Sequence, residues 1–257
     1  MGYAGRSRST HTLILAARQR GDEPFDFKLC QQGGDGAASK PTACRKRVDV
    51  ARIEAKMVEQ WLRLSLLPGL GDESFRRLLF DFGSPEQILN AGRAALGKII
   101  PARLAGAICD GGAHDRLDVV ASWLDDPANR IVTLADAHYP RALLQIPDPP
   151  PLLYVKGRVD LIDQPALAVV GSRNATPQGV ATAETFSKAL SDSGLTIVSG
   201  LALGIDAAAH RGGLAGRARS VAIVATGLDV VYPARNRTLA HALAAQGALV
   251  SEFALGT

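Results

Sequence analysis

Short apolar runs alternate with helical patterns through the second half of the chain. The β-branched, apolar runs occur at residues 166–170, 196–198, 220–225 and 248–250. Between them, apolar positions recur every three or four residues, which indicates helices. Strands that alternate with helices at this spacing are typical of an α/β fold with a parallel sheet. We therefore predict a Rossmann-like, doubly wound sheet over residues 129–257.

The first half carries helical patterns almost alone, and residues 53–128 are predicted to form a small all-α domain. Ser84-Pro85 marks a helix start, with the serine as N-cap and the proline at the first helical position. Pro68-Gly69-Leu70-Gly71 lies between two helical stretches. It either joins two helices of a bundle or forms a hairpin whose amides bind a DNA phosphate. We favour the first, because the acidic side chains directly after the turn would oppose a phosphate.

Two strand-to-helix junctions follow one another in the sequence. The first runs from Gly171-Ser172-Arg173 to Thr176-Pro177, where the threonine is the expected N-cap. The second runs from Ser199 through Gly200 and Leu201 to Gly204 and a helix that begins near Asp206. The helix between the junctions has its apolar residues at Val180, Ala183, Phe186, Ala189 and Leu190.

The residue types at these junctions suit an anion. Glycine lets a backbone approach a ligand closely, and free N–H groups at a helix start attract negative charge. Arg173 adds a permanent charge and a fork that matches a phosphate. Tight turns of an ordinary α/β domain, with Arg173 paired to an acidic neighbour, are the alternative. Neither G-x-G-x-x-G nor a Walker lysine is present.

Other polar residues near these junctions have both structural and functional interpretations. Asp206 and His210 lie four residues apart on one helix face, which suits a cap and a packed histidine better than a catalytic or metal pair. Asn236 either fixes a loop or lines the site. Lys156 is either a surface charge or an extension of a phosphate track. Tyr232 and Phe253 are the aromatic candidates for stacking a base.

Charge is distributed unevenly along the chain. Residues 1–52 hold ten Lys and Arg against five Asp and Glu, whereas the remaining 205 residues hold nineteen against twenty. A nucleic-acid site in the folded part would therefore be a local patch. The first 52 residues are rich in Gly, Ser, Arg and Gln and are predicted to be a disordered or spurious extension. No run suits a membrane span or a signal peptide, so a cytoplasmic location is expected.

Cysteine usage and catalytic motifs narrow the chemistry further. Cys30, Cys44 and Cys109 are widely spaced, which argues against a disulfide framework or a zinc site. G-x-S-x-G and paired carboxylates in a Gly-rich turn are absent. No cofactor, metal or catalytic residue is expected.

Long motifs occur in a fixed order: VVGSR at 169–173, SGLALGIDAAAH at 199–210 and VAIVATGLDVVYPARN at 221–236, preceded by IPDPPPLLYVKG at 146–157. This series resembles the DNA-processing protein A family, also called DprA or Smf, over roughly residues 61–257. The resemblance implies a non-enzymatic protein that binds single-stranded DNA, loads the RecA recombinase in natural transformation, and forms a homodimer in its full-length state. It also implies a helical part similar to a sterile-alpha-motif domain.

The resemblance also implies a DNA-binding set of residues. The set is Lys156, Gly171, Ser172, Arg173, Thr176, Ser199, Gly200, Leu201, Gly204, Asp206 and Asn236. The family continues beyond the point where this chain stops, with an arginine-rich stretch and further strands, so we expect a four-stranded half-sheet with an open edge. The rival hypotheses are a Rossmann-type enzyme that binds or cleaves a nucleotide, and an inactive fragment.

Overall fold

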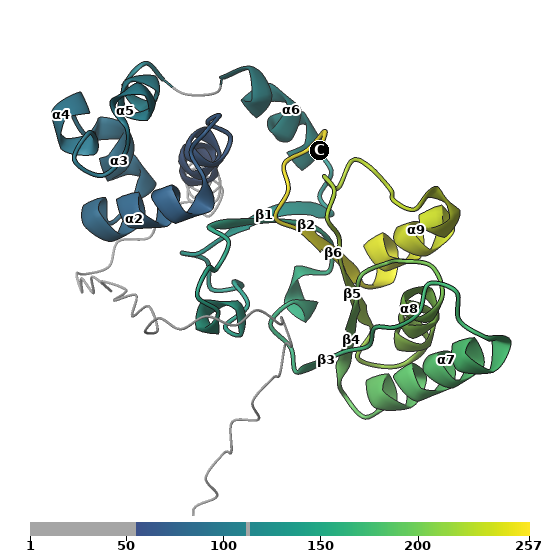
Figure 1. Cartoon of the computed structure of the whole chain (residues 1–257). Helices are drawn as coiled ribbons and strands as arrows, with labels where there is room; N and C mark the ends of the chain where they lie inside the picture. Colours follow the sequence, from purple (N-terminus) through teal and green to yellow (C-terminus); the bar gives the residue numbers. More distant parts are fainter. Residues whose placement is uncertain (1–54, 112–113) are drawn as a thin grey trace, which may run out of the picture.

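The computed structural model describes residues 55–111 and 114–257 (Figure 1). The predicted extension at residues 1–52, with Cys30 and Cys44, lies outside these ranges. Helices fill the first part of the described chain, and a sheet with three crossover helices fills the rest. No described helix has the length and apolar character needed to cross a bilayer.

The helical part is built from short helices. Residues 55–65 are helical, followed by α2 (Asp72–Phe82), α3 (Pro85–Asn90), α4 (Arg93–Leu96), α5 (Ala102–Cys109) and α6 (His114–Leu124). The predicted start at Ser84 is confirmed, because its hydroxyl accepts a 3.3 Å hydrogen bond from the Gln87 amide. The Pro68–Gly71 turn joins the first described helix to α2, and Gly69 has a φ of 88° that favours glycine.

The sheet has six strands in the order β1-β2-β6-β5-β4-β3. They are β1 (Asn129–Thr133), β2 (Leu152–Gly157), β3 (Ala166–Ala168), β4 (Thr196–Ser199), β5 (Ser220–Ile223) and β6 (Ala248–Ser251). Strands β3 to β6 are parallel, whereas β2 pairs antiparallel with both β1 and β6. The expected four-stranded sheet was wrong, because the β1–β2 pair extends it beyond β6. β3 forms the other edge.

The crossover helices α7 (Pro177–Asp192), α8 (Ile205–Ala215) and α9 (Arg237–Gln246) all lie on one face of the sheet (Figure 1). Each crossover moves one strand further in the same direction, and right-handed crossovers then place every helix on the same side. The α/β class with a preceding all-α part is confirmed. A doubly wound sheet needs a reversal of strand order, which the described strands do not contain.

The opposite face is covered unevenly. Tyr139, from the β1–β2 connection with the 3-10 helix η1 (Leu143–Gln145), packs on β5 and β6. Leu161, in the 3-10 helix η2 (Val159–Leu161) between β2 and β3, belongs to the same cluster. Towards β3 the cover ends, and Val170 is 72% exposed. The sheet is therefore closed by packing at one end and open at the other.

The apolar face predicted for α7 is right in part: Val180, Ala183 and Leu190 are half-buried, whereas Phe186 and Ala189 are exposed. The fully buried residues of α7 are Ser187 and Ser191, and Phe186 is 57% exposed. The reason is the partner helix: a Cβ on Gly212 of α8 would collide with the α7 backbone, and one on Gly216, just after α8, would collide with Ser191. Small residues on both helices allow this close approach, so the contact leaves no space for a large side chain.

The helical part and the sheet share one hydrophobic cluster. Trp61 and Phe75 from the helices and Ile131 and Tyr154 from the sheet belong to it. Arg76 adds polar contacts from α2 to the Asp148 carboxylate at 2.6 Å and the Pro149 carbonyl at 3.1 Å. These contacts pack the helical part against the sheet, whose first strand begins at Asn129.

Candidate nucleic-acid interface

The first junction follows β3 and is exposed to solvent. The Thr176 hydroxyl accepts a 3.1 Å hydrogen bond from the Gly179 amide, which confirms it as the N-cap of α7. The Ser172 hydroxyl accepts from the Asn174 amide at 3.1 Å. Arg173 is exposed and makes no ion pair or hydrogen bond with any described residue. The alternative in which an acidic neighbour neutralises it has no support in the described chain.

The second junction, after β4, packs directly on the first. The Ile205 amide donates to the Ser172 carbonyl at 3.1 Å, and the Ser199 hydroxyl donates to the Val169 carbonyl at 2.7 Å. Gly204 has a φ of 76°, and a Cβ there would collide with the Ser172 carbonyl oxygen. The two junctions therefore lie side by side at the carboxyl ends of β3 and β4, where ligands of open α/β sheets bind.

Most amides of the second junction are used within the protein. The Asp206 carboxylate accepts from the Gly200 amide at 3.2 Å and from the Ala202 amide at 3.3 Å. His210 Nε2 accepts from the Leu201 amide at 3.3 Å. Three N–H groups that the sequence offered to a phosphate are therefore already bonded, two of them to the Asp206 carboxylate.

Several backbone N–H groups of the two junctions have no hydrogen-bond partner among the described residues. These open amides include those of Gly171, Ser172, Arg173, Leu203 and Gly204. They come from both junctions, at the edge that carries the Arg173 side chain. Clustered N–H groups next to an arginine form an anion-binding arrangement.

A third loop, after β5, adjoins the second junction. Asn236, in η3 (Ala234–Asn236), donates to the Leu201 carbonyl at 2.8 Å and to the Ala202 carbonyl at 3.1 Å. The side chains of its neighbours Arg235 and Arg237 are exposed and, within the described chain, make no ion pair or hydrogen bond. These arginines were not among the residues predicted for the site. They could have been found from the sequence, because they flank Asn236 in the loop that follows a predicted strand.

Lys156 does not belong to this group. In the β2–β6 register it lies opposite Leu249, one residue from the amino-terminal end of β6, whereas the two junctions follow carboxyl ends. Its ammonium group also lies 3.4 Å from the Asp126 carboxylate. The prediction failed because β2 runs antiparallel to its neighbours, so the end of β2 points away from the site.

The candidate stacking residues Tyr232 and Phe253 are accessible. Tyr232, in the loop after β5, is 72% exposed, and Phe253, just after β6, is 37% exposed. Both lie on segments that follow carboxyl ends of strands, so each is available to an extended ligand at this edge.

The buried polar side chains at these junctions serve as hydrogen-bond partners within the protein. Burial lowers the pKa of His210 to about 4, so its imidazole is neutral near pH 7 and serves as a hydrogen-bond partner. Asp206 is hydrogen-bonded to two amides. In the part of the chain that the structure describes, no three His, Cys, Asp or Glu side chains gather as a metal site would require.

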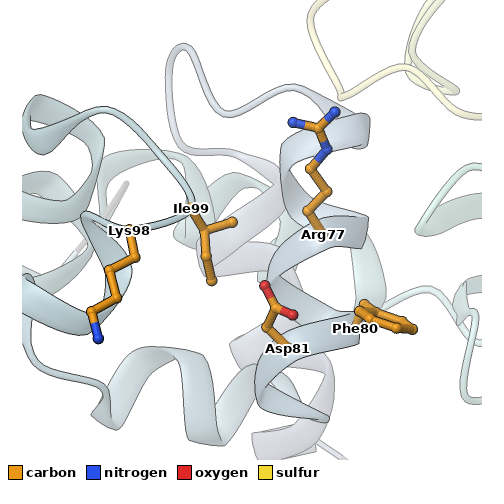
Figure 2. A pocket seen from close by; sticks show the side chains of 5 residues that line it. All are labelled: Arg77, Phe80, Asp81, Lys98 and Ile99. Carbon is orange, nitrogen blue, oxygen red and sulfur yellow. The ribbon is translucent and has the colours of Figure 1, made fainter.

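A cleft in the helical part offers a contrast. Figure 2 shows Arg77, Phe80 and Asp81 of α2 across from Lys98 and Ile99. The Arg77 guanidinium lies 2.7 Å from the Glu73 carboxylate, so its charge is already countered. Asp81 adds a negative charge to the lining of the same cleft. This cleft is therefore a weaker candidate for a polyanion than the edge that carries Arg173.

Residues 130–257 match the family model described as DNA recombination-mediator protein A. The chain belongs to this family. Protein Smf of Synechocystis is 35% identical over an alignment that covers 77% of this chain and 51% of that protein. DNA processing protein DprA of Streptococcus pneumoniae is 41% identical over 48% of this chain and 44% of its own length.

A solved structure supports the same relationship. The X-ray structure of DprA from Streptococcus pneumoniae superposes with a TM-score of 0.61 and 29% sequence identity, covering 77% of this chain and 67% of that one. The resemblance seen in the sequence motifs is thus confirmed. The chain spans about half the length of the curated relatives it matches.

Proposed function

We propose that this chain binds single-stranded DNA along the edge formed by the two junctions and the third loop. The observation that carries the proposal is an exposed Arg173 without an acidic partner in the described chain, beside the open amides of the two junctions. Phosphate groups accept hydrogen bonds from both kinds of donor. Membership of a family of DNA recombination mediators supports the same ligand.

The arrangement favours contacts with the DNA backbone. Arg173, Arg235 and Arg237 supply charge, and the open amides supply directed donors. No described strand or helix at this edge presents side chains suited to a duplex groove, where base edges are read. Sequence preference is therefore expected to be weak, with Tyr232 and Phe253 stacking bases of any type.

The finer parts of the proposal come from the family resemblance. They are that the protein acts without catalysis, hands the strand to the RecA recombinase during transformation, and works as a homodimer in its full-length state. RecA filament formation on DNA already coated by this chain would test the hand-over. A nucleotide-cleaving enzyme remains the rival, and hydrolysis assays with nucleotides and DNA would reveal it.

The decisive experiment is fluorescence anisotropy of a labelled oligo-dT, titrated with the chain at several salt concentrations and with duplex competitor. Binding should favour the single strand. The logarithm of the binding constant should fall with the logarithm of the salt concentration, with a slope of about −0.7 per phosphate contact. Arg173→Ala should weaken binding about tenfold, since it removes a charge-assisted contact.

Arg158→Ala is the matched control, because this exposed arginine pairs with Asp160 at the other end of the sheet. It should leave the affinity nearly unchanged. A chain that melts cooperatively and binds no single strand would refute the proposal. Equal losses in the two variants would show that overall charge, and not this edge, holds the DNA.

A further inference from the structure

Leu201 has an unusual backbone for its residue type. Its φ is 59°, in the left-handed region that branched side chains rarely occupy. Its side chain is 1% exposed and packs with Ala222, Leu243 and Leu249. Strained residues of this kind persist where the surroundings hold them firmly, and they cluster at functional sites.

Both peptide groups of Leu201 are held by side chains. Its amide donates to His210 Nε2 at 3.3 Å, and its carbonyl accepts from Asn236 Nδ2 at 2.8 Å. His210 comes from α8 and Asn236 from η3, so two separate elements fix one residue. Neither of these side chains lies at the open surface of the site, since both are buried.

A further hydrogen bond sets the orientation of the imidazole. His210 Nδ1 lies 2.8 Å from the Ser220 hydroxyl, and that hydroxyl lies 2.7 Å from the Ile197 carbonyl. A carbonyl only accepts, so Ser220 donates its one hydrogen to Ile197 and accepts from His210 Nδ1–H. Nε2 is then the acceptor that the Leu201 amide requires. β4 and β5 thus anchor the histidine.

We propose that His210 and Asn236 are positioning residues for the DNA site. By holding Leu201 in the left-handed conformation, they set the direction of the chain that follows it. The open amides of Leu203 and Gly204 then lie beside Arg173. This inference rests on the proposed function, because it explains how the second junction presents donors to a phosphate. It assigns a role to a buried histidine that touches no ligand.

Two substitutions at one position separate positioning from packing. His210→Leu keeps a side chain of similar volume but makes it apolar, so the acceptor for Leu201 is lost. His210→Gln restores an acceptor for Leu201 and a donor for Ser220. We expect His210→Leu to weaken oligo-dT binding about tenfold and to make the salt dependence shallower by about 0.7, the loss of one phosphate contact. His210→Gln should recover most of both.

Val155→Ala is the control for stability alone, since Val155 is buried in the cluster that packs on the opposite face of the sheet. It should lower the melting temperature and leave the salt dependence unchanged. A folded His210→Leu chain with the unaltered salt dependence would overturn the proposal. So would a His210→Gln chain that binds as poorly as His210→Leu.

Amide hydrogen exchange on the unaltered chain gives a test that needs no variant. The Leu201 amide should be protected in the free protein, and the Leu203 and Gly204 amides should exchange fast until oligo-dT is added. Equal exchange at Leu201 and Leu203 in the free protein would show that His210 does not hold the Leu201 amide. This contrast is measurable even if the chain binds no DNA, so failure of the positioning role and failure of the proposed function remain distinct.

Discussion

The two strand-to-helix junctions look alike in sequence and differ in what they leave available. After β3, the amides of Gly171, Ser172 and Arg173 have no partner within the described chain. After β4, the amides from Gly200 to Ala202 are bonded to Asp206 and His210. A Gly-rich turn is therefore an anion site only where no side chain of the protein has already taken its N–H groups.

Besides the open amides of Leu203 and Gly204, the second junction contributes rigidity. It lies against the first through Gly204 and supports the third loop through Asn236. The open junction with Arg173 thus stands on a neighbour whose own backbone is fixed. Three predictions test this division, beginning with the largest expected effect.

Gly204→Ala should break the contact between the junctions. A Cβ there would collide with the Ser172 carbonyl and lie 2.8 Å from the Arg173 carbonyl, in addition to the strain at a φ of 76°. We expect the free energy of unfolding to fall by about 4 kcal/mol, since backbone atoms must move. Urea denaturation measures this change.

Gly194→Ala is the matched control for that substitution. Gly194 also has a positive φ, of 95°, but a Cβ there would meet nothing within 4 Å. It should cost about 1 kcal/mol from the backbone alone. Similar losses in the two variants would mean that the junctions do not depend on their close contact.

Acidification should loosen the second junction through His210. Burial lowers its pKa to about 4 from 6.5. Between those values the unfolded chain binds a proton that the folded chain does not. The contribution of His210 to the free energy of unfolding should therefore be fully present above pH 6.5. As the pH falls towards 4, the free energy of unfolding should decrease by about 3 kcal/mol.

Denaturation of the unaltered chain and of His210→Leu across this pH range isolates the contribution of the histidine. Carboxylates contribute equally to both curves and cancel in the difference between them. That difference should therefore vary with pH through the titration of His210 alone. A constant difference would show that His210 has an ordinary pKa in the folded chain. The conformation of Leu201 would then depend on packing alone.

Arg235→Ala and Arg237→Ala should each have a smaller effect, on DNA affinity. Each should reduce oligo-dT binding about threefold to tenfold and make the salt dependence shallower by about 0.7. Lys156→Ala serves as the control, since Lys156 lies at the other end of the sheet beside Asp126. A larger loss from Lys156→Ala than from either arginine would move the proposed DNA path away from the third loop.

Local signals in the sequence determined the elements of this protein. The N-caps Ser84 and Thr176 are confirmed by the structure, because a cap and its helix involve residues only a few positions apart. The motifs from Val169 to Asn236 were also sufficient to indicate the family, which the comparisons confirm.

Tertiary structure decided how those elements combine. Pairing of β2 with β6 joins residues almost a hundred positions apart, and it places Lys156 away from the site. The buried face of α7 departs from the predicted one at Phe186 and Ala189, since glycines in and just after α8 set the contact. Which amides stay open likewise depends on His210 and Asp206 folding back on the loop. Long-range contacts of this kind leave no periodic trace in a single sequence, and they select the donors that face a ligand.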